Sequence, residues 1–264
     1  MQKNGPIALL FNALVITFML APLVIVCLVA FTPEETLTIP TTSFSLRWFD
    51  QVLHHPDFVQ SFWNSLGLAV SAASISTALA VPAAIALVRY EIPGRGALQA
   101  LFLSPLIIPH LVLGVAMLRM FSLVGGQGSF GWLIFAHALV VMPYTMRLVM
   151  AALIGFDRSA EQAAYSLGAS NATVFKRITL PMILPGITGG WLLAFINSFD
   201  ELTMSIFVIS PSTVTLPVRM YMYATESLDP MMAAVSALIV FITLGLMLLL
   251  DKVYGLDRIL IGKH

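Results

Sequence analysis

Six long apolar runs, separated by short polar stretches, constrain the fold of this chain more than any other feature. The runs cover residues 7–31, 62–88, 98–121, 131–154, 182–209 and 231–253. Each run reaches the roughly 20 residues that an α-helix needs to cross the hydrocarbon core of a bilayer. Only 10% of the residues are charged, whereas a soluble domain carries about 25%. The sequence therefore predicts an all-α, polytopic membrane protein with six transmembrane helices.

The first run lies where a secretory signal would lie, but its length argues against one. A signal peptide has an apolar core of about 7–15 residues, and no small-x-small cleavage site follows this longer run. Val26 stands before Cys27, where cleavage of a lipoprotein signal needs a small residue. We therefore expect an uncleaved first helix. Cys27 is the single cysteine of the chain, so no disulfide framework is expected.

Lysine and arginine are distributed unequally over the segments that join the runs. If the N-terminus is cytoplasmic, the cytoplasmic segments contain Lys3, Arg89, Arg95, Arg158, Lys176, Arg177, Lys252, Arg258 and Lys263. The outer segments then contain only Arg47, Arg119 and Arg219. Because cytoplasmic loops carry the excess of positive charge, both termini and the segment 155–181 are predicted to be cytoplasmic.

The segment 161–181, EQAAYSLGASNATVFKRITLP, is polar and helix-prone in a chain that is 59% hydrophobic. Gly168 suits the left-handed residue that ends a first short helix. Ser170 or Asn171 can cap a second one. Pro181 starts the next membrane helix, where its missing N–H is harmless. The pattern predicts a helix–turn–helix at the membrane surface, and an amphipathic helix resting among lipid headgroups explains it equally well.

Six residues of this segment match a spaced motif, E-A-A-x-x-x-G followed by nine residues and I-x-L-P. They are Ala163, Ala164, Gly168, Ile178, Leu180 and Pro181. The segment resembles the cytoplasmic loop of permease subunits of bacterial ATP-binding-cassette type I importers, the binding-protein-dependent transport inner-membrane components. The glutamate position of the motif is occupied by Gln162, and Glu161 precedes it. In that family the loop forms a coupling helix in a groove of the ATPase subunit, so the resemblance implies that these eight residues couple to an ATPase.

The resemblance extends over nearly the whole chain. It implies the type I importer permease fold, with one transmembrane permease domain over 1–264, a core of about 60–254 and a coupling loop of about 155–181. The segments LSPLIIPHLVLGVAML and INSFDELTMSIFV are most similar to the spermidine/putrescine branch, which makes a polyamine the expected substrate. Permeases for iron, opines and phosphonates share much of this pattern and remain alternatives.

The same resemblance implies the partners of the chain. They are a second permease subunit, an ATPase dimer, a periplasmic substrate-binding protein and the lipid bilayer of the bacterial inner membrane. No G-x-x-x-x-G-K-[ST] motif occurs, so ATP and magnesium are expected on the ATPase subunits, and this chain is expected to be no enzyme. A stand-alone secondary transporter or channel is the alternative of a different class, but it gives no reason for an ATPase-docking motif.

No cofactor, metal or nucleic acid is expected on this chain, whose formal net charge is zero. His54, His55 and Asp57 form the one cluster with metal-ligating side chains. Because the cluster follows an amphipathic stretch in an acidic outer loop, a surface that touches the binding protein or lipid headgroups explains it better than a metal site.

Asp200 and Glu201 are notable because they fall within the fifth apolar run. A carboxylate in hydrocarbon costs at least about 2.5 kcal/mol, so such residues usually face a cavity or a partner. On a continuous helix, Glu201 shares one face with small and polar residues, namely Gly190, Ala194, Asn197 and Ser205. Asn197, Asp200 and Glu201 are therefore candidates for the substrate path. The alternative is a structural ion pair with Arg119 or with the partner permease.

Prolines inside the apolar runs are expected to kink their helices, because each one removes a backbone hydrogen bond. Pro82 and Pro143 each stand alone in a run, whereas Pro105 and Pro109 are one turn apart. The latter two, beside His110, are expected to shape a cavity.

The orientation can be tested by labelling with a membrane-impermeant thiol reagent in intact spheroplasts, after Cys27 is replaced by serine. A cysteine at Asn171 should resist the reagent, because the positive-inside rule places it in the cytoplasm. A cysteine at Asp50 should react. The opposite pattern would overturn the orientation.

Overall fold

The computed structural model describes residues 5–40 and 43–254, and the regular elements in these ranges are all helices. Lys3, Arg258 and Lys263, three of the residues behind the predicted orientation, lie outside the described residues. The chain divides into a central unit, Ser61–Arg219, and a terminal unit formed by Met1–Gln60 and Met220–His264. The single permease domain therefore stays a prediction.

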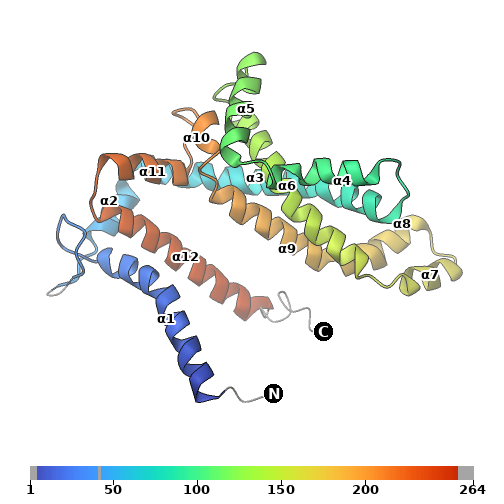
Figure 1. Ribbon diagram of the computed structural model, residues 1–264, viewed down its shortest axis with the longest axis horizontal. Helices are drawn as coiled ribbons and strands as arrows, with labels where there is room; N and C mark the ends of the chain where they lie inside the picture. The colour runs from blue at the N-terminus through green and yellow to red at the C-terminus, as the bar shows by residue number, and fades with distance from the viewer. Residues whose placement is uncertain (1–4, 41–42, 255–264) are drawn as a thin grey trace. The chain divides into compact units, whose positions relative to one another are not determined.

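The central unit contains most of the helices that matter for function. They are α3 (Pro56–Arg89, from Ser61), α4 (Arg95–Leu103), a 3₁₀ turn (Ser104–Leu106), α5 (His110–Leu123), α6 (Phe130–Ile154), α7 (Ser159–Ser166), α8 (Asn171–Val174), α9 (Leu180–Phe199), α10 (Ser205–Val208) and the start of α11 (Leu216–Glu226). Figure 1 shows α6 and α9 side by side over much of their length. The polar loop that connects them carries α7 and α8.

The terminal unit contains α1 (Pro6–Val29), α2 (Arg47–His54) and α12 (Met231–Tyr254), and α12 packs on both of the others. Arg47 holds the segment before α2 by donating from Nη1 to the Pro33 carbonyl at 2.9 Å. Trp48 adds a bond from Nε1 to the Glu34 carbonyl at 3.2 Å. These bonds give the polar segment after α1 a defined conformation.

Four helical segments are long and apolar enough to cross a membrane, namely α1, α3, α6 and the stretch Asn171–Phe199. The bent pair of α4 and α5 raises the number to as many as five if it forms one span. In the part of the chain that the structure describes, α12 contributes a shorter apolar helix, Met231–Gly245. The sixth span therefore stays a prediction.

The prediction of one helix over 98–121 is wrong. The chain changes direction by 99° between Arg95–Leu106 and His110–Leu123. Pro105 lies in the 3₁₀ turn and Pro109 is the N-cap residue of α5. Two prolines one turn apart remove two backbone donors, which explains a break where Pro82 and Pro143 are each tolerated inside a continuous helix.

The prediction of one helix over 182–209 is also wrong. α9 ends at Phe199 with Asp200 as its C-cap residue, and α10 begins only at Ser205. The Glu201 side chain explains the break, because its carboxylate accepts a bond from the Met204 backbone N–H and so replaces a helical bond. Glu201 therefore does not continue the helix face of Gly190.

The other end of α9 is continuous with α8 through a π-helical turn, Phe175–Thr179. In this turn the Leu180 N–H bonds to the Phe175 carbonyl, five residues back. Pro181 follows in the first turn of α9, as predicted, but the helix is continuous there, so its missing N–H falls inside a helix and not at a free helix end. The second short helix of the loop thus runs directly into the membrane helix.

Close contact between α6 and α9 depends on glycine. A Cβ added to Gly190 would lie 2.8 Å from the Thr145 Cα, and one added to Gly186 would lie 2.9 Å from the Leu148 carbonyl oxygen. The Thr145 hydroxyl donates to the Gly190 carbonyl at 3.1 Å. Small residues and side-chain hydrogen bonds of this kind hold helices together where hydrocarbon replaces water.

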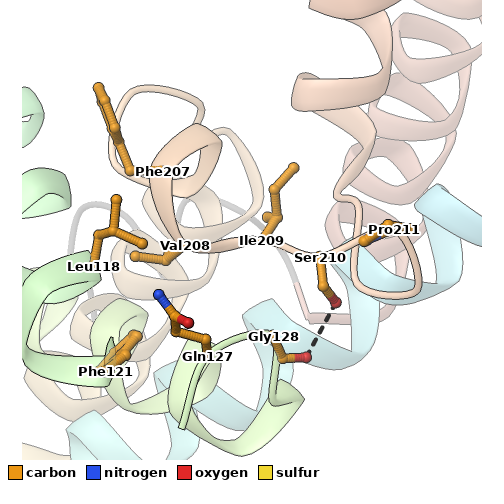
Figure 2. Close-up of a pocket in the computed structure, with 9 residues that line it drawn as sticks. All are labelled: Leu118, Phe121, Gln127, Gly128, Phe207, Val208, Ile209, Ser210 and Pro211. Atoms are coloured by element: carbon orange, nitrogen blue, oxygen red, sulfur yellow. Dashed lines mark hydrogen bonds between the residues drawn. The ribbon is translucent and has the colours of Figure 1, made fainter. Parts of the chain in front are cut away.

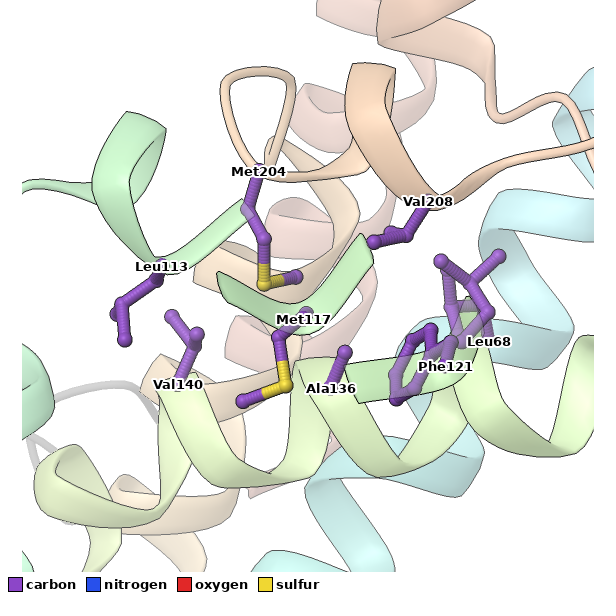
Figure 3. Close-up of a cluster of buried hydrophobic side chains, with 9 residues drawn as sticks. Leu68, Leu113, Met117, Phe121, Ala136, Val140, Met204 and Val208 are labelled. Atoms are coloured by element: carbon purple, nitrogen blue, oxygen red, sulfur yellow. The ribbon is translucent and has the colours of Figure 1, made fainter. Parts of the chain in front are cut away.

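A second contact region of the central unit is a buried hydrophobic cluster that brings α5 against α6 (Figure 3). Its labelled members are Leu68, Leu113, Met117, Phe121, Ala136, Val140, Met204 and Val208. They come from α3, α5, α6 and the segment around α10. The cluster therefore anchors the segment that follows the break after α9.

The role of Gly190 can be tested by comparing two alanine variants of the same helix. Gly190→Ala forces a methyl group against the Thr145 backbone, whereas a Cβ at Gly189 meets only the Leu148 side chain, at 3.5 Å. Both variants gain the same helix propensity, so the difference between them isolates the packing cost of about 1–3 kcal/mol. We expect a lower thermal unfolding midpoint for Gly190→Ala in detergent. Equal midpoints would contradict the close contact.

Candidate coupling loop and acidic site

The loop between α6 and α9 is ordered by its own turn chemistry. Gly168 has φ +81°, the left-handed conformation predicted for it. Its N–H bonds to the Tyr165 carbonyl at 2.9 Å, and the Ala169 N–H bonds to the Ala164 carbonyl at 3.0 Å. This pair of bonds is the Schellman motif, which ends α7 and reverses the chain.

The second short helix of the loop has a side-chain cap. Ser170 accepts a hydrogen bond from the Thr173 N–H, so Ser170 rather than Asn171 is the N-cap residue. Before α7, Asp157 accepts bonds from the Ser159 N–H at 2.9 Å and hydroxyl at 2.8 Å. Both bonds lower the pKa of the exposed Asp157 carboxyl, and the bond from the Ser159 backbone N–H has the larger effect.

Glu161 faces inward, although it lies on a polar loop. Only 5% of the residue is exposed. Its Oε1 accepts a bond from Arg89 Nη2 at 2.6 Å and another from the Thr179 hydroxyl. Burial disfavours the ionised carboxylate, but the bonds from Thr179 and Arg89 and the Arg89 charge outweigh it, so the pKa of Glu161 is lowered. Glu161 thus binds its own chain, where the sequence predicted a partner contact.

The other residues of the predicted coupling loop are arranged around a surface. Gln162, Ala163, Gly168 and Pro181 are exposed, whereas Ala164, Ile178 and Leu180 are half-buried. The loop also exposes Leu167 by 89% and, to a lesser extent, Tyr165 and Phe175. The loop therefore presents an ordered surface with exposed apolar side chains.

Glu201 forms a buried contact at the end of α9 that lies away from the loop. Its Oε2 lies 2.6 Å from His110 Nδ1, and its Oε1 accepts a bond from the Met204 N–H at 2.7 Å. Only 7% of Glu201 is exposed. Within the described residues the Glu201 carboxyl thus contacts His110 and not Arg119, the partner that the sequence suggested for a structural ion pair. His110 begins α5, so the contact ties the bend before α5 to the break after α9.

A second histidine completes a buried polar network at this break. His137 on α6 lies 2.9 Å from the hydroxyls of both Ser198 and Ser205. Ser205 donates its one proton to the Glu201 carbonyl, so it accepts from His137 Nε2. A neutral ring then accepts from Ser198 at Nδ1, and every member of the network is satisfied.

Asp200 and Asn197 differ from Glu201 in their surroundings. Asp200 is exposed, and its carboxylate makes no side-chain hydrogen bond or ion pair with the residues that the structure describes. Asn197 is half-buried and donates to the Leu193 carbonyl of its own helix at 2.8 Å. The three candidate path residues therefore lie near one another in the chain but do not form one cluster.

The structure contains a pocket of about 330 Å³ between α5 with the loop that follows it and α10 with the segment that follows it (Figure 2). It is lined by Leu118, Phe121, Gln127, Gly128, Phe207, Val208, Ile209, Ser210 and Pro211. The Ser210 hydroxyl donates to the Gly128 carbonyl at 3.1 Å across one side of it. None of the lining residues is charged, so the pocket has no group to balance a cationic ligand.

Within residues 5–40 and 43–254 no three His, Cys, Asp or Glu side chains gather in a way that would hold a metal ion. In the outer segment, His54 Nδ1 lies 3.2 Å from Asp50 Oδ1, and both side chains are exposed.

Sequence reasoning missed the residues that hold the two carboxylates. Arg89 is 72 positions from Glu161, and His110 is 91 positions from Glu201. The available signals were that Arg89 directly follows an apolar run and that His110 follows Pro109 inside one. Neither signal identifies a partner so far along the chain.

Long apolar helices and an ordered polar loop that joins two of them define a polytopic membrane protein. Residues 78–256 match the family described as binding-protein-dependent transport system inner membrane component. The chain belongs to this family, and it is a permease component of an ATP-binding-cassette importer.

Curated relatives cover most of the chain. It is 29% identical over 239 residues to spermidine/putrescine transport system permease protein PotC of Haemophilus influenzae, which covers 90% of this chain and 93% of that protein. It is 32% identical over 232 residues to putrescine transport system permease protein PotI of Escherichia coli strain K12. This match covers 84% of this chain and 82% of that protein. Molybdate/tungstate transport system permease protein WtpB of Thermococcus kodakarensis is 29% identical over 208 residues, covering 78% and 82%.

Solved structures show the same fold. A chain of a bacterial ABC transporter that imports alginate has a TM-score of 0.70 at 16% identity, over 96% of this chain and all of that one (100%). A chain of the MetNI methionine ABC transporter has a TM-score of 0.59 at 19% identity. The match covers 78% of this chain and 96% of that one. The predicted importer permease fold is confirmed to this extent.

The different surroundings of the two carboxylates predict different effects on stability. Glu201→Ala leaves the buried Met204 N–H without its acceptor, which costs about 1–3 kcal/mol. Asp200→Ala removes an exposed carboxylate and should change stability by at most about 0.5 kcal/mol. Thermal unfolding of the purified protein in detergent should show a lower midpoint for Glu201→Ala alone. Equal midpoints would show that the Glu201 contacts are not made.

Proposed function

We propose that this chain is the permease subunit through which a bacterial importer carries a polyamine, putrescine or spermidine, across the inner membrane. The observation that carries the proposal is the similarity to PotC and PotI, which extends over 90% and 84% of the chain. The substrate named for these relatives agrees with the branch that the sequence segments resemble. Permeases for iron, opines or phosphonates remain the weaker alternatives.

The energy for transport comes from separate subunits. ATP and magnesium bind to an ATPase dimer, and this chain binds no cofactor. A second permease completes the membrane part, and a periplasmic protein delivers the substrate. The exposed Gln162, Leu167 and Tyr165 give the loop a surface that fits a groove of the ATPase. This arrangement requires a cytoplasmic loop. We further propose cytoplasmic termini and six spans, in a single permease domain.

The acidic region gives a polyamine a favourable route. A polyamine carries several positive charges, which are strongly disfavoured in a low-dielectric region without a counter-charge. Carboxylates along the route offset this cost, provided that they bind weakly enough to release the substrate. The exposed Asp200 is available for direct contact, whereas the adjacent Glu201 is buried, with its carboxyl bound to His110. Asn197 lies one turn before them on α9.

Uptake by the reconstituted importer tests this route. Asp200→Asn and Glu201→Gln are nearly isosteric, and glutamine keeps an acceptor for the Met204 N–H. We expect each change to lower ATP-driven uptake of radiolabelled putrescine or spermidine several-fold, while the ATPase is recovered with the permeases as in the wild type. Glu91→Gln, which removes an exposed carboxylate on the loop after α3, is the matched control and should leave uptake unchanged.

Two results would contradict the proposal. Normal uptake in both acidic variants would remove the cation path. The second result is that the wild-type importer takes up an anion such as molybdate and no polyamine. This chain would then have the substrate class of the WtpB relative.

A further inference from the structure

Three elements of the central unit meet at the Glu161 carboxylate. Glu161 belongs to α7, Arg89 is the last residue of α3, and Thr179 ends the π-helical turn that leads into α9. Arg89 and Thr179 both donate to the same oxygen, Oε1. We name these three residues the clasp.

Arg89 is the side chain through which α3 holds the loop. The loop is covalently continuous with α6 and α9, but α3 lies far from it in the chain. Among the hydrogen bonds and ion pairs of the described residues, the bond between Arg89 and Glu161 is the one that joins α3 to the loop. The Arg89 guanidinium also lies 5.9 Å from the centre of the Phe156 ring, at the start of the loop.

Both ends of this link are firmly placed. The Glu161 side chain is 6% exposed and the Arg89 side chain 19%, so both charges are largely removed from water. Just before Arg89, α3 buries Ala80, Ala84 and Leu87 in a hydrophobic cluster with Met146 and Ile183. A displacement of the loop is therefore transferred to a packed helix rather than absorbed by a loose side chain.

We propose that the clasp transmits movement of the coupling loop to α3, and that Arg89 and Glu161 are positioning residues for coupling ATP hydrolysis to transport. The proposal rests on the proposed importer function and adds a route into the membrane that the chain connections of the loop do not provide. It also gives Glu161 a role that is distinct from ATPase contact, because its carboxylate is turned away from the exposed face of the loop.

The test compares single and double neutral variants in proteoliposomes with the ATPase, the second permease and the binding protein. Arg89→Gln or Glu161→Gln alone leaves one buried charge without its partner, which should reduce recovery of the complex. The double variant removes both charges and should restore recovery. A glutamine at 89 is too short to replace the arginine link, so we expect the uptake per ATP hydrolysed to fall several-fold in the double variant.

The matched control is Glu35→Gln. It breaks an Arg–Glu pair of 3.3 Å between Arg47 and Glu35 that is exposed and outside the loop. Its uptake per ATP should equal that of the wild type. Uptake per ATP hydrolysed distinguishes a coupling role of the clasp from a purely stabilising one. A loss of stability lowers the recovery of the complex but leaves the uptake per ATP of the remaining complexes unchanged.

Each other outcome for the double variant overturns the proposal. A normal ratio with normal recovery would mean that the clasp only neutralises buried charge. Failure of the double variant to assemble would assign the clasp a purely structural role. The proposed function is judged separately on the wild type, which must recover the ATPase, hydrolyse ATP and take up a polyamine.

Discussion

The contact between α6 and α9 is the interaction on which both candidate sites depend. Gly190 lets the backbones approach until no Cβ fits, and the Thr145 hydroxyl binds the Gly190 carbonyl across the contact. In hydrocarbon, such packing and hydrogen bonding replace the hydrophobic effect as the force that joins helices. At one end this helix pair carries the coupling loop, and at the other it carries His137 and the break before Glu201. The spacing between the two sites is set by these two helices.

A buried carboxyl group is bound by its surroundings at both ends of the α6–α9 helix pair. Glu161 is held by Arg89 and Thr179, and Glu201 by His110 and the Met204 N–H. A carboxylate taken out of water is stable only when its oxygens are bound in this way. In both places the carboxylate joins segments that are distant in the chain, so the cost of burial is offset by contacts that fix the arrangement of the helices.

Local features of the chain were predictable, and long-range ones were not. The left-handed Gly168, the Ser170 cap and the first-turn Pro181 depend on a few neighbouring residues, and all three are found. The break after Phe199 was missed because hydropathy continues through Leu202 and Ile206, whereas the Met204 N–H donates to the Glu201 carboxylate instead of to a helical carbonyl. The partners of Glu161 and Glu201 were missed because spacing along the chain carries no information on contacts made by folding.

We propose that the loop between α6 and α9 binds the ATPase through the face that the clasp leaves exposed. Photo-crosslinking from Leu167, which is 89% exposed, tests it most directly in the assembled transporter. The account predicts a crosslink from position 167 to the ATPase subunit and none from position 50 in the outer segment. A crosslink from position 50 to the ATPase, or none from position 167, would contradict it.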